Sequence, residues 1–433
     1  MVSQCRGRWA GEMQGSMTTQ VGSCDRHRSR IGASLPVPHG PASSRPLPCR
    51  PLAPHPGAGL GRSGPVRTVR TYTLAVSDPS PSEPAARPLQ VLSLVPLATE
   101  ARRAIEAVDD RVVLALAPGW FDGEIRATWG DYVAESYLPA GAVGHGTRDQ
   151  RDALLAETDV ILAGFPVPVD LRARAPHLRW VHQTPAGASN LHRCDLWGSD
   201  VTVSTSRGLG NTLAIAEYVV ATFLSFAREL HRAPAERSAG AFDRFAYRPV
   251  QLAGKTVCVV GAGGIGQEVG RLCAALGMHV VGTRSSAGGA VPAGFDHIGG
   301  PDELPALVAR STFVAVCCQW TPQTHGLIGA EALAAMPDGA VLVNVARGEI
   351  IDEAALVAAL DRLRGVALDV YVGEFDHAPP PALWSHPNVL ITPHVSGGAD
   401  VRPGRPVELF VRNLEALLEG RPLDNVIDWD RGY

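Results

Sequence analysis

Three side chains of complementary chemistry stand at the ends of apolar segments in the C-terminal half of the sequence. Arg347 follows the segment AVLVNV, Glu374 follows GVALDV, and His394 follows NVLIT. An arginine can hold a substrate carboxylate and polarise the neighbouring carbonyl, and a histidine can donate a proton to that carbonyl. A carboxylate beside the imidazole can orient it and favour its protonated form. Together these residue types predict the reduction of an oxo acid.

Each of these residues also has an ordinary structural interpretation. A single arginine, glutamate or histidine after a strand is more often a solvated surface residue than a catalyst, and the sequence contains 14 histidines. His325, His377 and His386 have no histidine or cysteine partner at a metal-chelating spacing, so no metal site is predicted. The sequence also lacks the GxSxG segment that would support serine chemistry.

A glycine-rich segment, TVCVVGAGGIG, provides a second candidate site. A strand pattern leads directly into Gly261, Gly263 and Gly266, and a helical pattern and a second strand, HVVGT, follow. These glycines would permit a tight turn, close approach of a pyrophosphate, and close packing of helix on sheet. Free N–H groups at the helix start would bind the phosphates. The segment predicts a dinucleotide site that includes Gly264 and Ile265; the alternative is a glycine-rich turn without a ligand.

The end of the strand HVVGT should select the dinucleotide. An acidic residue there would bind the ribose hydroxyls of NAD, but the sequence has Arg284 followed by Ser285 and Ser286. A guanidinium and two hydroxyls suit the 2′-phosphate of NADP. We therefore expect NADP(H), with NAD as the alternative cofactor. If Arg284 is only a solvated charge, the protein should not discriminate between the two.

From Leu89 onward, apolar segments such as VLSLV, DVILAGF and LRWVHQT alternate with helical stretches. This alternation is typical of an α/β fold with parallel sheets, whose ligands bind outside the carboxyl ends of the strands. Arg347, Glu374 and His394 should therefore meet in one crevice beside the glycine turn. A long helix over 211–230 should lie at the boundary between two lobes. Its predicted apolar face consists of Leu213, Ala216, Val220, Phe223 and Phe226.

Residues 1–88 differ in composition from the rest of the chain. They are rich in Pro, Gly, Ser and Arg, with eleven arginines against four acidic residues, and show no periodicity. Such a segment cannot bury enough apolar surface to offset its ordering entropy, so we expect a disordered extension. One interpretation is that the start of the chain is misassigned or that the segment is a dispensable tail. The alternative is a targeting leader or an arm that binds nucleic acid.

Cysteine content and hydropathy indicate the cellular compartment in which the protein is expected. The chain has eight cysteines, too few for a disulfide scaffold, and Cys317 and Cys318 are adjacent in an apolar segment. Buried thiols and a cytoplasmic location are therefore expected. Charged residues, glycine or proline interrupt every apolar stretch before it reaches the length of a membrane helix, so a membrane association is not expected.

Four segments, GAGGIG, LVNVARGEIIDEAAL, GVALDVYVGE and NVLITPHVSGG, resemble the D-isomer-specific 2-hydroxyacid dehydrogenase family. The resemblance extends from about Val91 to the last residues. It implies a Rossmann cofactor domain inserted into a discontinuous, flavodoxin-like substrate domain. We expect the Rossmann domain at 207–395 and the two parts of the substrate domain at 89–206 and 396–433.

The resemblance also implies roles for individual residues. The matches to the family's catalytic arginine, glutamate and acid/base histidine are Arg347, Glu374 and His394. Asp369 matches the aspartate near the nicotinamide carboxamide. In TPAGASN, Ala186 and Gly187 match a loop whose N–H groups bind the substrate carboxylate. Two further residues expected to contact the cofactor are Thr321 and Ala346.

The sequence departs from the family pattern at three places. Trp320 stands where a small residue or proline is common, Phe375 where a proline usually follows the glutamate, and Ser189 lies in a stretch that usually contains an acidic residue. Formate dehydrogenases of this fold typically lack the glutamate, so Glu374 favours reduction of an oxo acid over oxidation of formate.

The expected function is therefore NADPH-dependent reduction of a small 2-oxo acid to the D-2-hydroxy acid. Glyoxylate, hydroxypyruvate and phenylpyruvate-like acids are the candidate substrates. The resemblance also implies a homodimer with the 211–230 helix and the following loop at or near the interface. A nucleotide-sensing corepressor on the same fold is the alternative function. The acidic chain beyond residue 88 shows no basic stripe, so no direct nucleic-acid binding is expected.

Overall fold

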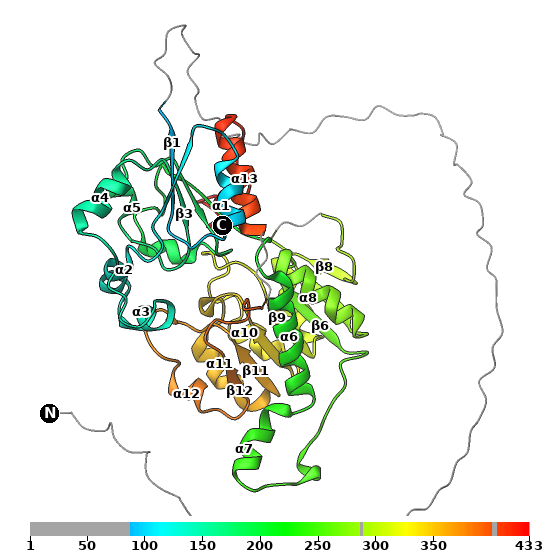
Figure 1. Cartoon of the computed structure of the whole chain (residues 1–433). Helices are drawn as coiled ribbons and strands as arrows, with labels where there is room; N and C mark the ends of the chain where they lie inside the picture. Colours follow the sequence, from blue (N-terminus) through cyan, green and yellow to red (C-terminus); the bar gives the residue numbers. More distant parts are fainter. Residues whose placement is uncertain (1–86, 286–288, 401–404, 433) are drawn as a thin grey trace, which may run out of the picture. The chain divides into compact units, whose positions relative to one another are not determined.

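The computed structural model of the chain describes residues 87–285, 289–400 and 405–432 (Figure 1). The expected extension lies outside the described residues apart from Arg87 and Pro88, and Ser286 also lies outside them. All described residues belong to one contact unit of the chain, Arg70–Tyr433. No helix formed by the described residues is long and apolar enough to span a membrane.

Five parallel strands form the first sheet. They are β1 (Leu89–Ser93), β2 (Val112–Leu116), β3 (Val160–Ala163), β4 (Trp180–Gln183) and β5 (Thr202–Thr205). Their spatial order, β2-β1-β3-β4-β5, is that of flavodoxin-like folds. Strands β3 and β4 are buried along their whole length, because the parallel sheet is covered on both faces. The accompanying helices are α1 (Thr99–Glu106), α2 (Asp122–Trp129), α3 (Asp131–Tyr137), α4 (Arg148–Ala156) and α5 (Leu171–Arg174).

The C-terminal segment returns to this first sheet. Helix α13 (Arg405–Leu418) lies beside α1 (Figure 1), and its Phe410 stacks on Trp180 of β4 with the ring centroids 4.9 Å apart. Further along, the Ile427 N–H donates a hydrogen bond to the Val203 carbonyl of β5 at 2.8 Å. The first sheet is therefore completed by residues from the other end of the described chain.

Seven parallel strands form the second sheet. They are β6 (Thr256–Val260), β7 (His279–Thr283), β8 (His297–Gly299), β9 (Phe313–Val316), β10 (Val341–Asn344), β11 (Gly365–Leu368) and β12 (Val389–Ile391). The order β12-β11-β10-β9-β6-β7-β8 reverses between β6 and β9, as in a Rossmann fold, where ligands bind at the reversal. Its helices are α6 (Thr212–Ala227), α7 (Ala233–Ser238), α8 (Gly264–Ala275), α9 (Leu304–Ala309), α10 (Ala330–Ala335), α11 (Glu353–Ala359) and α12 (Pro381–Trp384).

The helix predicted at 211–230 is α6, but its buried face differs in part from the prediction. Phe223 and Phe226 are fully buried as expected, whereas Leu213 is 47% exposed and Val219 is buried. The prediction of Leu213 is wrong because the buried positions begin only in the second turn of α6, where the helix packs on α8 and the sheet. Helix α6 is therefore a core helix of the seven-stranded sheet.

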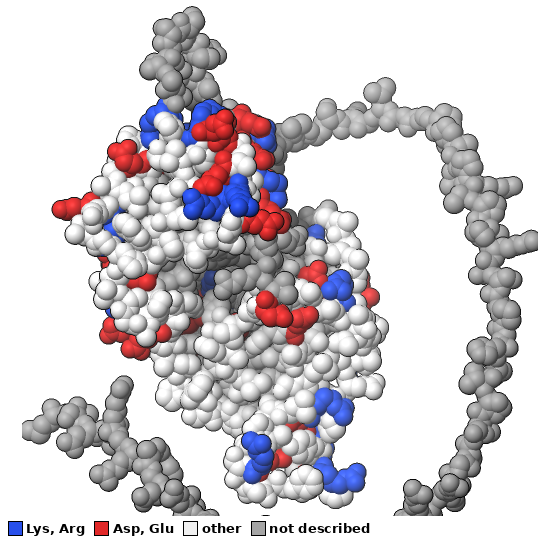
Figure 2. All heavy atoms as spheres, viewed as in Figure 1, with Lys and Arg blue, Asp and Glu red and all other residues white. Residues whose placement is uncertain are grey.

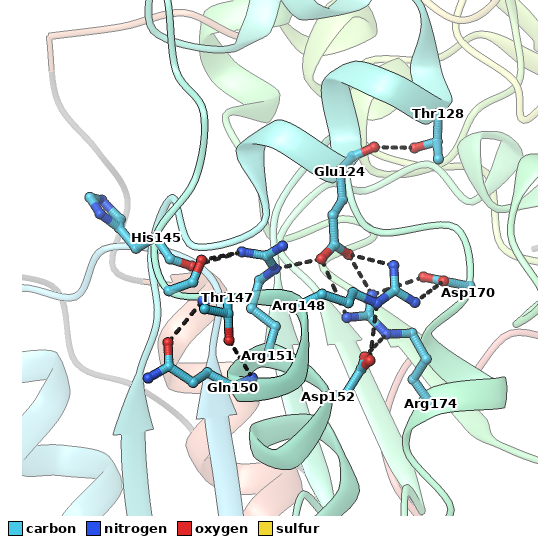
Figure 3. Close-up of polar contacts among 11 residues, drawn as sticks. Glu124, Thr128, His145, Thr147, Arg148, Gln150, Arg151, Asp152, Asp170 and Arg174 are labelled. Atoms are coloured by element: carbon cyan, nitrogen blue, oxygen red, sulfur yellow. Dashed lines mark hydrogen bonds and ion pairs between the residues drawn. The ribbon is translucent and has the colours of Figure 1, made fainter.

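Helix α2 is fixed to α4 and α5 by a cluster of charges around Glu124 (Figure 3). An Nη1 of Arg148 lies 3.5 Å from the Glu124 carboxylate, and Arg151 and Arg174 form ion pairs with the same carboxylate. Glu124, Arg151 and Arg174 are largely buried, so water screens these pairs less than it screens surface pairs. The cluster holds α2, and α3 follows it directly; these two helices carry Trp129 and Tyr137.

Candidate active site

Glu374 and His394 meet beyond the carboxyl ends of β11 and β12. Nδ1 of His394 lies 3.2 Å from Oε2 of Glu374, and the side chains are 29% and 8% exposed. The backbone of His394 has a φ of 52°, which is uncommon for a residue with a side chain and indicates that the ring is held in place at a cost in strain. Because the carboxylate engages Nδ1, Nε2 is the ring nitrogen that can exchange a proton with a ligand.

The second carboxylate oxygen of Glu374 is unusual. Oε1 is buried, and none of the described residues donates a hydrogen bond to it. Leaving a buried acceptor unpaired costs about 1 to 3 kcal/mol, and more when the group is charged. Such groups are rare in folded proteins and call for a functional explanation. The carboxylate is therefore suited to act on His394 and on a bound molecule rather than to stabilise the fold.

A buried aspartate fixes the turn that carries His394. The carboxylate of Asp369 accepts hydrogen bonds from the Thr392 hydroxyl at 2.6 Å and from the backbone N–H groups of Val395 and Ser396, both at 2.8 Å. Asp369 thus binds the turn on both sides of the histidine. The family resemblance implied a contact between Asp369 and the nicotinamide, and that contact stays a prediction.

Arg347 lies at the carboxyl end of β10 and reaches the first sheet. The buried Asn344 side chain donates to the Arg347 carbonyl at 2.8 Å and accepts from the Ala346 N–H at 3.0 Å, which fixes the loop between them. Nε of Arg347 donates to the Ser189 hydroxyl at 2.8 Å. Residue 189 lies just beyond β4, so the guanidinium contacts residues that belong to both sheets. Ser189 was seen in the sequence only as a departure from the family pattern.

The loop of Ala186 and Gly187 lies against the same guanidinium. A Cβ on Gly187 would be only 2.4 Å from Nη2 of Arg347, so a side chain at residue 187 would push the guanidinium away from this position. No acceptor for the N–H of either residue is found among the described residues. Two free N–H groups beside a guanidinium can bind a carboxylate. The structure therefore brings the predicted substrate loop and Arg347 together.

The glycine turn has the geometry expected for each of its glycines. Gly261 has a φ of 96°, and its Cβ would lie 2.6 Å from the backbone of Cys318 after β9. A Cβ on Gly266 would lie 2.2 Å from the Gly261 carbonyl oxygen. Gly263, in contrast, has open space where its Cβ would be. The backbone at Gly263 is therefore accessible to a ligand, as a pyrophosphate requires.

Helix α8 begins directly after this turn. Its first residue is Gly264, and Gln267 is the first residue whose N–H bonds within the helical pattern, to the Gly263 carbonyl. The N–H groups of Gly264, Ile265 and Gly266 therefore lie in the first turn and can bind phosphate oxygens, supported by the helix dipole. The site fits a dinucleotide on this geometry.

Arg284 and Ser285 follow β7 as predicted. The Arg284 N–H donates to the Gly299 carbonyl at 3.0 Å, and its side chain is half-buried, with Nη1 2.7 Å from where a Cβ on Gly289 would be. Asp296 accepts from the Val280 N–H at the opposite end of the strand. Asp296 therefore does not supply a carboxylate at the strand end where the ribose of NAD would bind.

Thr321 and Ala346, which were also predicted to contact the cofactor, form hydrogen bonds within their own loops. Thr321 is buried, and its N–H donates to the Thr324 hydroxyl at 2.8 Å. The Ala346 carbonyl accepts from Nη1 of Arg347 at 2.6 Å. These bonds show how both residues are positioned, and their contacts with a cofactor stay predictions.

Four aromatic side chains form a wall beside Glu374, which we call the aromatic wall. It consists of Trp129, Tyr137, Phe165 and Phe375. Phe375 follows Glu374 directly, and its ring centroid lies 5.1 Å from that of Phe165. The other three residues come from the part of the chain that forms the first sheet. Sequence reasoning identified only Phe375, because nothing in the sequence indicates contacts over such separations.

Tyr137 lies between the aromatic wall and two of the candidate catalytic residues, Glu374 and Arg347. Burial raises the pKa of Tyr137 to about 12, and the negative charge of Glu374 acts in the same direction, while the Arg347 guanidinium opposes it. The phenol therefore lies within electrostatic reach of both residues. This places Glu374, His394, Arg347 and the aromatic wall in one neighbourhood.

The chain is similar to several known proteins. Residues 220–396 match the family model "D-isomer specific 2-hydroxyacid dehydrogenase, NAD binding domain". The structure is similar to that of a D-isomer specific 2-hydroxyacid dehydrogenase from Xanthobacter autotrophicus Py2 in complex with NADPH and MES, with 28% identity and a TM-score of 0.61. A family member from Aeromonas salmonicida has the same identity and TM-score. Each match covers 80% of this chain and 100% of the other.

Curated relatives include D-3-phosphoglycerate dehydrogenases. The one from Mycobacterium tuberculosis is 34% identical over 281 residues, which are 61% of this chain and 51% of the relative. The one from Methanocaldococcus jannaschii is 29% identical over 286 residues, 63% of this chain and 52% of the relative. The chain thus spans about half the length of these curated relatives. The family match identifies residues 220–396 as an NAD binding domain of the D-isomer specific 2-hydroxyacid dehydrogenase family, and the described chain is similar in structure to two members of that family.

Proposed function

We propose that the chain reduces a small 2-oxo acid to the D-2-hydroxy acid and uses NADPH in preference to NADH. The observation that carries this proposal is the contact of 3.2 Å between His394 Nδ1 and Glu374 Oε2, with Arg347 in the same neighbourhood. A proton donor, a carboxylate that orients it and a cation for the substrate carboxylate are the groups that this reduction needs.

Each residue has a defined task in this proposal. The Arg347 guanidinium and the N–H groups of Ala186 and Gly187 bind the substrate carboxylate, with Ser189 holding the guanidinium in place. His394 delivers a proton from Nε2 to the carbonyl oxygen. Glu374 fixes the ring through Nδ1 and stabilises its positive charge. The nicotinamide would supply the hydride to the carbonyl carbon.

The preference for NADPH rests on the end of β7. Arg284 is a cation at the position where a carboxylate would bind the ribose of NAD, and Ser285 adds a hydroxyl. A charge-assisted bond to the 2′-phosphate favours the phosphorylated cofactor. The similar protein from Xanthobacter autotrophicus Py2 was crystallised with NADPH, which supports the proposal.

We also propose which parts of the chain bind the cofactor and which bind the substrate. Residues 207–395 would bind the cofactor, and residues 89–206 with 396–433 would bind the substrate, as the return of the C-terminal segment to the first sheet supports. The five cysteines among the described residues are free thiols, which supports a cytoplasmic location.

A homodimer is the proposed assembly. The segment after α6 carries the exposed aromatic side chains of Phe242 and Phe245 and extends away from the seven-stranded sheet with α7 (Figure 1). On the face drawn in Figure 2, charged side chains gather over α7 and over α1 and α13, and much of the surface between them is uncharged. A partner subunit covering Phe242 and Phe245 would remove this apolar surface from water.

The test is NADPH oxidation with a panel of 2-oxo acids, followed by chiral analysis of the product. Turnover to the D-isomer supports the proposal. Tight binding of NADPH without turnover of any 2-oxo acid would contradict it and favour the nucleotide-sensing alternative. The same assay with NADH tests the cofactor preference independently of the reaction.

A further inference from the structure

The aromatic wall carries an inference about the substrate that rests on the proposed function. Phe375 directly follows Glu374 in the chain, and Tyr137 of the same wall lies within electrostatic reach of the Glu374 carboxylate. The ring centroid of Phe375 lies 5.1 Å from that of Phe165, at 46° between the ring planes. Phe375 and Phe165 are both half-buried, and Tyr137 is 38% exposed. A ligand can therefore contact these rings.

The aromatic wall is held in place by a buried hydrogen bond and by ring packing. Trp129 is almost fully buried, and its indole N–H donates to the Val167 carbonyl at 2.6 Å. Phe165 packs edge-on against Trp129 and Tyr137, with centroid distances of 5.2 and 4.8 Å. The charge cluster around Glu124 holds the helix that carries Trp129 (Figure 3). The rings thus form a preorganised apolar surface, which lowers the entropy cost of binding an apolar group.

Arg193, a cation in contact with the aromatic wall, is already paired. Arg193 lies over the Trp129 ring with Cζ 5.6 Å from the centroid, and its Nη2 forms an ion pair with Asp376. A phosphate group placed against the wall would have to break this pair or lose its hydration against aromatic rings. Burial of a charged group without a partner is costly, whereas burial of an aromatic or aliphatic group is favourable.

We infer that the substrate is a 2-oxo acid with an aromatic or branched apolar side chain, which packs against Phe375, Phe165 and Tyr137. The carboxylate of this substrate lies on Arg347, its carbonyl oxygen faces His394, and its side chain extends along the wall. Phe375 is the main specificity-determining residue, because it is both adjacent to Glu374 and part of the wall. Phosphorylated 2-oxo acids and glyoxylate are poor substrates.

The experiment compares kcat/KM at saturating NADPH for phenylpyruvate, 4-methyl-2-oxopentanoate, glyoxylate, hydroxypyruvate and 3-phosphohydroxypyruvate. The first two should exceed each of the others by about 10-fold or more, the discrimination that an apolar pocket gives. A best substrate among the last three would overturn the inference while leaving the proposed reduction intact. No turnover of any of the five would overturn both.

Variants identify the residue responsible. Phe375→Ala should lower the ratio of kcat/KM for phenylpyruvate to that for glyoxylate by about 10-fold, and Phe375→Leu should retain more of it, because an apolar side chain is kept. Trp384→Ala removes an exposed aromatic side chain that is not part of the wall and should leave the ratio unchanged. Circular dichroism checks that each variant is folded. An unchanged ratio in folded Phe375→Ala, or in folded Phe375→Leu if the alanine variant does not fold, would overturn the assignment to Phe375.

Discussion

Nε of Arg347 lies 2.8 Å from the hydroxyl oxygen of Ser189, so a strand end of the seven-stranded sheet is tied to a loop of the five-stranded sheet. Beside this bond, a Cβ on Gly187 would lie 2.4 Å from Nη2 of the same guanidinium. The position of Arg347 therefore depends on residue 187 having no side chain.

Gly187→Ala should displace the Arg347 guanidinium and misalign the substrate. We expect kcat/KM for the best 2-oxo acid to fall by about 100-fold, since a displacement of about 1 Å can have this effect. NADPH affinity, measured by fluorescence titration, should not change. Gly300→Ala is a matched control, because φ at Gly300 is −79° and nothing lies within 4 Å of its Cβ position. Equal kinetics in the two variants would refute the steric argument.

His394→Ala should remove the proton donor and lower kcat by about 10² to 10⁴, the usual contribution of general acid–base catalysis. Glu374→Gln should also lower kcat, because a neutral amide does not balance the charge of the imidazolium. His279→Ala, in which an exposed ring at the start of β7 is removed, is the control. Steady-state kinetics with a 2-oxo acid measure all three. Near-normal turnover by His394→Ala would exclude His394 as the donor.

Arg284→Asp should reverse the cofactor preference. Loss of a charge-assisted bond to the 2′-phosphate costs about 1.5 to 3 kcal/mol, which corresponds to one to two orders of magnitude in kcat/KM for NADPH. The carboxylate in the variant can instead accept from the ribose hydroxyls of NADH. The measurement is kcat/KM for both cofactors in both proteins. Equal values for the two cofactors in the parent would mean that Arg284 does not bind the phosphate.

The buried His182 should make the fold sensitive to acid. Burial lowers the pKa of His182 to about 4, and both ring nitrogens bond to serine hydroxyls, of Ser204 and Ser206. Histidine in an unfolded chain titrates near 6.5, so between the two values the unfolded chain binds a proton that the folded protein excludes. Stability is therefore lost as the pH falls from about 6.5 to 4, by about 3 kcal/mol from this group.

The measurement is the free energy of unfolding in urea at pH 7 and pH 4.5 for the parent and for His182→Gln. Glutamine can bond the same hydroxyls but does not titrate, so the loss of stability between the two pH values should be smaller by about 2 to 3 kcal/mol. An equal loss in both proteins would show that other groups cause the acid sensitivity.

Replacing Phe242 and Phe245 by aspartate should weaken the proposed homodimer. Both rings are highly exposed, and two carboxylates at their positions would have to be desolvated in an interface. Light scattering at micromolar concentration should give a dimer for the parent and a monomer for the double variant. A parent that is already monomeric would contradict the proposed assembly.

The glycine turn could be predicted from the sequence because its constraints are local. Gly261, Gly263 and Gly266 are each required by contacts within one strand, turn and helix, and their spacing in the sequence reflects this. The convergence of residues after β10, β11 and β12 was also predictable, because parallel strands present their carboxyl ends at one edge.

The aromatic wall and the Arg347 contacts could not be predicted in the same way. Trp129 and Phe375 meet because two sheets come together, and no periodicity in either segment reflects that contact. The strands β2, β5 and β8 were not identified either: β2 and β8 are only partly buried, and β5 has the largely polar sequence TVST. Leu213 fits the helical spacing of α6 but is exposed, because spacing cannot show where along a helix the packing begins.

The hydrogen bond between Ile427 and Val203 has a consequence for folding during synthesis. All strands of the seven-stranded sheet lie between Thr256 and Ile391, so a nascent chain contains them before its last residues leave the ribosome. The strands of the five-stranded sheet are made first, yet Phe410 and Ile427 must be synthesised before they can cover Trp180 and pair with β5. The part of the protein that is translated first is therefore completed last, and its uncovered apolar surface is what a ribosome-associated chaperone would have to shield.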